Sequence, residues 1–219
     1  MAVLFDELLT KGIRQGKIPA KTSEARDWYR NQAQDYKRVR ENDFFGKKGD
    51  RERMSSRPIL GGMYMYEYTA KTKDTLPYYD RLPLIFPYKT VKGGFYGLNM
   101  HYLPLPLRAK LMDALYETAN NQAYDETTKL KISYKILDKA AKFKEFRPCF
   151  KHYLGTNVRS AFSRVPMTDW EIAIFLPVEQ FQKKGKTAVW NESAKIARSS
   201  GSISIKNTKA YYMRNRKKK

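Results

Sequence analysis

The feature that most limits the fold of this chain is a series of aromatic, strand-like segments between residues 63 and 103. Residues 63–68, 82–91 and 95–103 are rich in tyrosine, phenylalanine and aliphatic side chains, a composition typical of β-strands. Tight turns are expected between them, at residues 71–74 and at Lys92-Gly93-Gly94. Short aromatic strands joined by tight turns predict a small, strongly bent antiparallel sheet or barrel.

Helical patterns lie on both sides of these strands. Pro106 begins an expected helix whose apolar residues recur at spacings of three and four. Thr22 or Ser23 is expected to cap a helix that reaches about residue 41, and residues 190–198 are expected to form another. Helices combined with an antiparallel sheet predict an α+β fold with packed helices.

Three further segments are assigned from their patterns. Residues 130–137 alternate polar and apolar side chains, which predicts a strand. Residues 143–158 are expected to be helical after Pro148. Residues 170–176 form an apolar run interrupted by one acid, and this run is the strongest candidate for a buried strand.

The composition divides the chain into three parts. Residues 1–60 predict an N-terminal arm with helices, because their apolar stripes are narrow. A change at Gly61-Gly62 begins the predicted α+β core, residues 61–198. Residues 199–219 are predicted to be a basic C-terminal tail, tethered by a run of serines and a glycine.

Positive charge is concentrated near the C-terminus. The chain has 43 lysines and arginines against 22 acids, a net charge of +21, and residues 181–219 contain twelve of the bases with a single acid, Glu192. Lysines and arginines at this density repel one another, and binding to a polyanion, most commonly a nucleic acid, relieves the repulsion. The candidate DNA-binding residues are the bases of this segment and two tyrosines that would stack on an exposed base or duplex end: Lys183, Lys184, Lys186, Lys195, Arg198, Lys206, Lys209, Tyr211, Tyr212, Arg214, Arg216, Lys217, Lys218 and Lys219.

No base-reading module accompanies these cations. The sequence has no zinc-finger spacing, no heptad zipper and no aromatic RNA-binding signature. Binding is therefore expected to follow the phosphate backbone or the end of the duplex, whatever its base sequence.

Catalytic and metal-binding patterns are also missing from the sequence. His101 and His152 have no metal-ligand spacing, and Cys149 is expected to be a buried small hydrophobe, so we reject a Cys149–His152 dyad. No cofactor or metal is expected, and no membrane partner, because no apolar run approaches about 18 residues. A metal-dependent nuclease stays open as an alternative, since carboxylates can converge from distant positions.

Four runs of residues give the chain a resemblance to a known family. Residues 68–85, 94–104, 107–115 and 169–177 are similar to the DNA end-protector proteins of T-even-type contractile-tailed phages, and the similarity extends over roughly residues 22–195. The resemblance implies a minor virion component, made in the host cytoplasm, that binds the double-stranded DNA terminus of the packaged genome, shields it from exonuclease and takes part in head completion. It implies no catalytic residues.

A second interpretation is a structural protein of the virion. Terminal segments that bury few apolar side chains of their own often become ordered only when they bind a partner. This behaviour suits a head–tail connector (neck) or baseplate protein. In that case the basic arms would bind neighbouring head, portal, neck or tail subunits instead of DNA.

Overall fold

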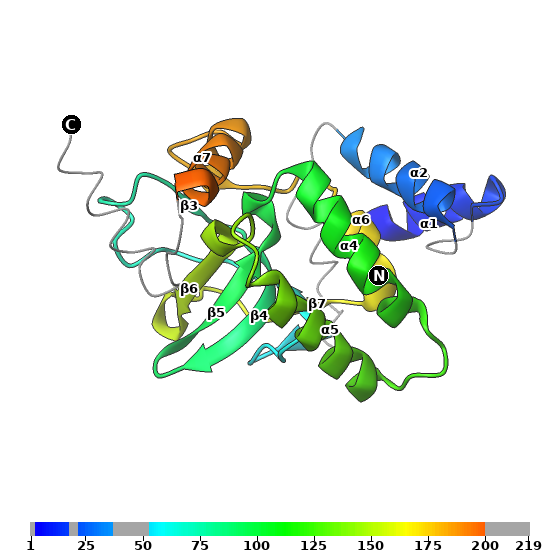
Figure 1. Ribbon diagram of the computed structural model, residues 1–219, viewed down its shortest axis with the longest axis horizontal. Helices are drawn as coiled ribbons and strands as arrows, with labels where there is room; N and C mark the ends of the chain where they lie inside the picture. Colours follow the sequence, from blue (N-terminus) through cyan, green and yellow to red (C-terminus); the bar gives the residue numbers. More distant parts are fainter. Residues whose placement is uncertain (1–2, 18–21, 37–52, 200–219) are drawn as a thin grey trace.

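The computed structural model describes residues 3–17, 22–36 and 53–199 (Figure 1). Its α-helices are α1 (Val3–Arg14), α2 (Ser23–Gln34), α4 (Leu105–Asn120), α5 (Glu126–Ala140), α6 (Trp170–Ala173) and α7 (Lys186–Ser199). Its strands are β1 (Met54–Ser55), β2 (Met63–Met65), β3 (Tyr79–Asp80), β4 (Leu84–Val91), β5 (Gly94–Asn99), β6 (Phe150–Leu154), β7 (Phe162–Val165) and β8 (Phe181–Gln182). Short 3₁₀ turns, including η2 (Met100–Tyr102) and η3 (Arg147–Cys149), join several of them.

The strands form an antiparallel sheet of six in the order β1-β7-β2-β4-β5-β6, and β3 pairs separately with β8. The α+β class with an antiparallel sheet and packed helices is confirmed. The sheet is open, with β1 and β6 at its edges. Of the two forms that the strand pattern allowed, the described strands adopt the sheet and do not close into a barrel.

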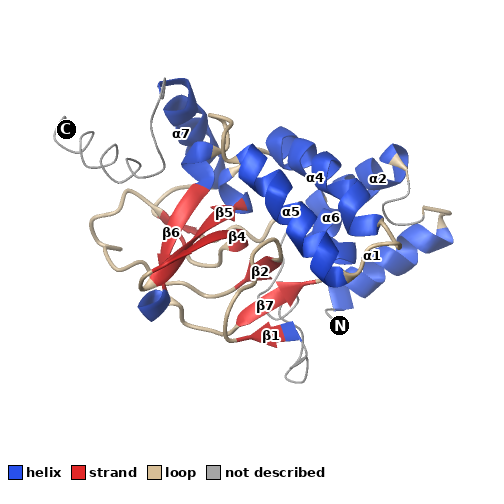
Figure 2. Ribbon diagram, turned by 60° about the horizontal axis from the view of Figure 1, so that its bottom comes forward, coloured by secondary structure: helices blue, strands red, loops and turns tan. Residues whose placement is uncertain are grey.

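Both faces of the central sheet are buried. Met63 and Met65 of β2 point into the main core, whereas Tyr64 and the following Tyr66 point to the opposite face, as the two-residue period of a strand requires. Helices pack on the first face (Figure 2). The second face holds a cluster of rings that also includes Phe95, and the loops of the sheet cover it.

The two N-terminal helices contribute to the main core. Phe5 of α1 and Tyr29 of α2 are buried in the same cluster as the strands. Thr22 is the N-cap of α2, because its hydroxyl accepts a hydrogen bond of 3.1 Å from the amide of Ala25. The helix ends at Gln34, earlier than predicted, and residues 37–41 lie outside the described residues. The division at residue 60 stays a prediction.

The strand predicted at residues 130–137 is wrong, because this segment lies inside helix α5. Its alternation of polar and apolar residues coincides with a second pattern of period 3.6, in which Ser133, Leu137 and Ala140 face the core. Asp125 supplies the N-cap: its Oδ1 accepts a hydrogen bond of 2.7 Å from the amide of Thr128. The cap and the buried face together favour the helix.

Two other predicted segments also adopt a different structure. Residues 150–154, predicted as helix, form strand β6, since they complete the hydrogen bonds of β5. Residues 170–176, predicted as strand, begin with helix α6, and every side chain in the run is buried. A short run that is buried on every side has no period that distinguishes a helix from a strand. Packing against the rest of the protein therefore decides between the two.

Candidate nucleic-acid interface

Helix α7 carries two of the predicted DNA-binding residues on its outer face. Val189, Ser193 and Ile196 are buried against the turns η2 and η3. Lys195 and Arg198, three residues apart on the other side, are exposed. Neither side chain forms a hydrogen bond or ion pair with another described residue, so both are available to phosphate oxygens.

The three lysines that precede this outer face contact the protein itself. The Nζ atom of Lys183 donates hydrogen bonds to the carbonyls of Lys73, Asp74 and Leu76, at 2.6, 3.0 and 3.1 Å, and these bonds hold the 73–76 loop. The backbone of Lys183 has a φ of 73°, a left-handed conformation that is uncommon for a residue with a side chain. Lys183 therefore has a structural role in this loop.

Lys184 and Lys186 each have an acidic neighbour. Lys184 lies 2.5 Å from an oxygen of Glu192, the one acid of the C-terminal segment. Lys186 is 3.9 Å from Glu179 and lies over the ring of Trp190. Their charges are partly neutralised within the fold, in contrast to those of the outer face.

The remaining predicted residues lie outside the described residues: Lys206, Lys209, Tyr211, Tyr212, Arg214, Arg216, Lys217, Lys218 and Lys219. Their part in DNA binding stays a prediction. The structure shows where this segment begins, because it follows directly on α7.

A buried ion pair fixes the beginning of α7. Arg108 of α4 has no exposed surface and donates to Glu179 at 2.7 Å and to the carbonyls of Leu103, Ile174 and His101. Burial alone would raise the pKa of Glu179, but Arg108 and other nearby cations outweigh burial and hold that pKa below its ordinary value. The carboxylate is therefore charged, and the pair joins α4 to the segment that leads into α7.

The indole of Trp190 makes the corresponding contact from α7 itself. Its Nε1 donates a hydrogen bond of 2.8 Å to the carbonyl of His101, and its ring packs 5.3 Å from the guanidinium of Arg108. Because the inner face of α7 is held by these bonds, its outer cations are presented from an ordered helix.

The residues considered for catalysis occupy structural positions. Cys149 is fully buried, and burial raises the pKa of its thiol to about 12, so it is not a thiolate at neutral pH. His152 is exposed on β6 and stacks on Tyr96, with ring centroids 4.8 Å apart. His101 is buried, with its Nδ1 2.8 Å from Asp80.

Neither a metal centre nor a membrane span is found within the described residues. No three histidine, cysteine, aspartate or glutamate side chains lie together so as to hold a metal ion among these residues. In the same part of the chain, no helix has both the length and the apolar character that crossing a lipid bilayer requires.

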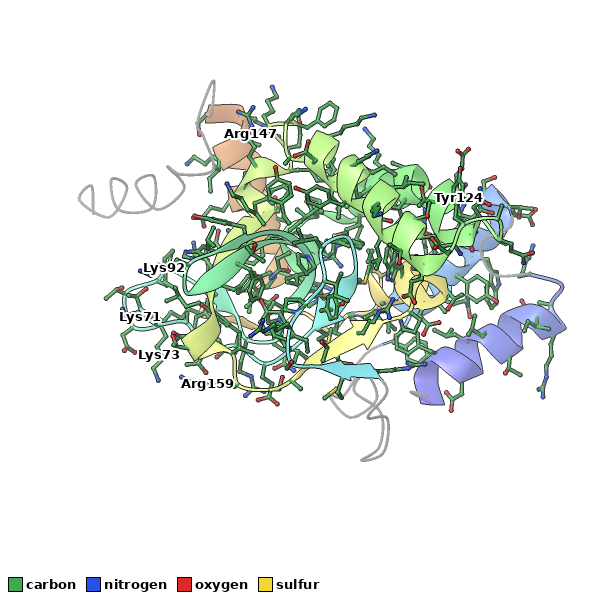
Figure 3. The ribbon with its side chains drawn as sticks, turned by 90° about the horizontal axis from the view of Figure 1, so that it is seen from below. Lys71, Lys73, Lys92, Tyr124, Arg147 and Arg159 are labelled. Atoms are coloured by element: carbon green, nitrogen blue, oxygen red, sulfur yellow. The ribbon has the colours of Figure 1, made fainter. Side chains whose placement is uncertain are left out.

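A second basic surface lies at one end of the sheet and was not predicted. Figure 3 shows Lys71, Lys73, Lys92 and Arg159 at this end of the molecule. They come from the 71–75 turn, the β4–β5 turn and the loop before β7, which backbone hydrogen bonds such as Gly155 N to Gly93 O, 2.9 Å, hold together. We call these four residues the loop-edge cluster. The sequence signal was the presence of a lysine or arginine in each of these three turns.

The family comparison covers most of this architecture. A family model described as phage T4 terminal DNA protecting protein matches residues 13–196 of the chain. The match begins in α1 and ends in α7, so it includes the sheet and the buried anchor of α7. Comparisons with curated proteins and with solved structures found no match.

Proposed function

The chain belongs to the phage T4 terminal DNA protecting protein family, and from this premise we propose that it binds the end of the packaged phage genome, whatever its base sequence, and shields that end from exonuclease. The family match over residues 13–196 is the observation that carries the proposal. The outward cations of α7 support it independently, because they are unpaired among the described residues and lead into the most basic part of the sequence.

The protective action we propose is steric. An exonuclease must thread or grip the terminus of a strand, and a folded body seated on that terminus occupies the same space. Lysines and arginines would hold the body in place by neutralising the flanking phosphates, a contact that carries no sequence information. No bond is made or broken in this action, so we propose that the protein is not an enzyme.

We further propose that the protein is carried in the virion, on the DNA and in contact with head, portal, neck or tail proteins. Exposed apolar side chains support a protein partner: Ile13 has 62% of its surface exposed and Ile59 has 54%. Cross-linking of intact particles, followed by identification of the linked peptides, would test this. Links from α1 or residue 59 to a head or neck protein are expected, and links to DNA alone would contradict it.

Digestion of linear duplex DNA by a double-strand exonuclease tests the proposed function. We expect the protein to slow digestion at low salt, with protection declining as salt is raised, because phosphate contacts release counterions. A nicking endonuclease acting on a covalently closed circle is the control for general coating of DNA. Equal exonuclease rates with and without the protein would overturn the proposal, and so would equal inhibition of both nucleases.

A further inference from the structure

Helix α5 carries a row of lysines on its solvent face. Lys131, Lys135 and Lys139 follow one another at intervals of four residues, and Lys142 lies three residues further on. All four are exposed. The buried residues of α5 lie on the opposite side of the helix, so its orientation is fixed by the core. At 1.5 Å per residue the three lysines within the helix, Lys131 to Lys139, span about 12 Å.

The charge of this row is largely uncompensated within the fold. Lys142 has a partly exposed acid, Asp138, at 3.9 Å, an arrangement that contributes little. The side chains of Lys135 and Lys139 form no hydrogen bond or ion pair with another described residue. Lys131 is close enough to Asp125 for its charge to help lower the pKa of that exposed carboxyl group. Three aligned cations on one helical face repel each other, and a polyanion relieves that repulsion.

An exposed aromatic ring stands at the end of the row. Phe143 has 60% of its surface exposed, a high value for a large apolar side chain. An ordered turn holds it in that position, since its amide donates to the carbonyl of Ala140 at 3.0 Å and its own carbonyl accepts from Phe146 at 3.1 Å. Lys142 and Lys144 are its neighbours in sequence, and both are exposed.

The turn that holds Phe143 leads directly to α7. Arg147, which begins the turn η3, donates a hydrogen bond of 3.1 Å to the carbonyl of Lys142. The turn η3 packs against α7, and Figure 3 shows Arg147 beside that helix. Arg147 thus connects the end of the α5 row with the helix that carries Lys195 and Arg198.

We propose that the α5 lysine row and Phe143 form the seat of the duplex terminus. The lysines lie along the phosphates of the last turn of DNA, where about 12 Å corresponds to roughly three to four base-pair steps of 3.4 Å. Phe143 stacks on the terminal base pair, whose outer face is exposed only at an end. The proposal rests on the proposed function and deepens it, because stacking on a terminal pair distinguishes an end from internal duplex.

The chemistry of the two parts explains why each is needed. Phosphate contacts act equally on every stretch of DNA and give affinity without a preference for ends. Stacking of an aromatic side chain on a base is tolerant of sequence, and inside a duplex the base faces are already stacked on their neighbours. Affinity therefore comes from the lysine row, and preference for the end comes from Phe143.

Binding of two short duplexes tests the proposal. One duplex has open blunt ends, and the other has the same sequence closed by a hairpin loop at each end. Replacement of Phe143 by alanine is expected to weaken binding of the open duplex about tenfold or more and to leave the closed duplex unchanged. Tyr124→Ala is the matched control, because Tyr124 is also an exposed aromatic residue, with 41% of its surface exposed, and lies far from Arg147 in Figure 3.

The salt dependence of binding tests the lysine row. In the triple variant K131Q/K135Q/K139Q, the slope of log affinity against log salt is expected to fall by about 2.7, or about 0.9 for each phosphate that is no longer neutralised. The variant K71Q/K73Q/K92Q removes the same charge from the loop-edge cluster and is expected to lower the slope by less than about 1. Glutamine has a helix propensity close to that of lysine, so α5 should remain folded, which equal unfolding midpoints would confirm.

The outcomes separate this inference from the proposed function. If the unchanged protein shows no preference for open ends and no exonuclease protection, the proposed function fails, and the seat fails with it. The seat alone is overturned if the unchanged protein protects ends but F143A keeps its full preference for the open duplex. It is also overturned if the salt slope of binding falls further in the loop-edge variant than in the α5 variant.

Discussion

The cations buried between the elements and the cations on the outer faces of α5 and α7 carry the same charge, yet they have different partners. Arg30 of α2 is buried against Glu171 of α6 and lies 2.7 Å from Asp113 of α4. Arg108 is likewise paired with Glu179. On the outer faces, Lys135 and Lys195 have no acidic partner among the described residues. Position within the fold decides whether a base contributes to stability or stays available for a ligand.

The physical reason is the cost of burying charge. An unpaired ion away from water costs several kcal/mol, so a buried arginine is stable only beside a carboxylate and further hydrogen-bond acceptors. A lysine in water carries no such cost, and its repulsion from like charges is modest until many of them gather. Among the described residues, the unpaired outer cations are therefore the ones most available to a polyanion.

The largest expected effect on stability is the loss of the Arg108 guanidinium. Arg108→Met leaves Glu179 charged, buried and without its main partner, and we expect the free energy of unfolding to fall by about 3–5 kcal/mol. Urea unfolding would measure this. Lys110→Met on the exposed face of the same helix is the control and should change stability by less than about 0.5 kcal/mol. Equal stability of the two variants would show that the buried pair is unimportant.

The largest expected effect on binding comes from removal of residues 200–219. This segment contains seven lysines and arginines, and if each contacts a phosphate, the slope of log affinity against log salt falls by about 6. Because α7 ends at Ser199, the truncated protein should unfold at the same urea concentration as the full chain. A salt slope that does not change would place the phosphate contacts on the helices instead of the C-terminal segment.

A smaller effect is expected from the outer face of α7. The variant K195Q/R198Q removes two unpaired cations and should lower the salt slope by about 2. The variant K183Q/K184Q removes two cations that bind carbonyls or Glu192 within the fold, and it should lower the slope by less than about 1. Salt titrations of duplex binding compare the two variants. A larger fall in slope for K183Q/K184Q than for K195Q/R198Q would show that the bases paired within the fold, and not the outer ones, contact the phosphates.

The smallest effect is an acid dependence of stability. The pKa of Glu179 is depressed in the folded state, so its contribution is complete above the unfolded value, about 4.3, and is lost as the pH falls through the folded pKa. E179Q should therefore lose less stability than the unchanged protein between about pH 5 and pH 2. E117Q, an exposed carboxylate on α4, is the control and should follow the unchanged protein. If the free energy of unfolding of E179Q and of the unchanged protein fell equally with decreasing pH, Glu179 would make no such contribution.

Much of the fold could be predicted where local signals agree with tertiary packing. The turn at Lys92-Gly93-Gly94 joins β4 to β5, and Gly93 has a φ of 80°, a conformation that glycine adopts without cost. Pro106 is in the first turn of α4, and Thr22 caps α2. In each case one residue has a backbone requirement that the sequence displays directly.

The candidate site could be predicted only in part. The concentration of bases predicts a site in the C-terminal segment, and the structure shows that Lys195 and Arg198 of this segment are exposed. Their contact with DNA stays a prediction. The α5 row was not recognised because the alternation in residues 130–137 predicts a strand. In a strand Lys131, Lys135 and Lys139 would also share a face, but neighbouring lysines would be about 13 Å apart along the chain instead of about 6 Å apart in a helix. The signal that would have revealed it is Asp125 as an N-cap, with a lysine at every fourth residue.

The sequence by itself indicated a polyanion as the class of partner, because net charge and its distribution along the chain do not depend on the fold. It also determined the α+β class, since the aromatic strands and the capped helices carry their own periods. Tertiary structure alone decided which bases are available. The Nζ atom of Lys183 donates hydrogen bonds to the carbonyls of Lys73 and Asp74, about 110 residues away in the sequence. Lys135 faces the solvent because Leu137, on the other side of the helix, is buried. Such pairings arise from packing between distant segments, and no local pattern records them.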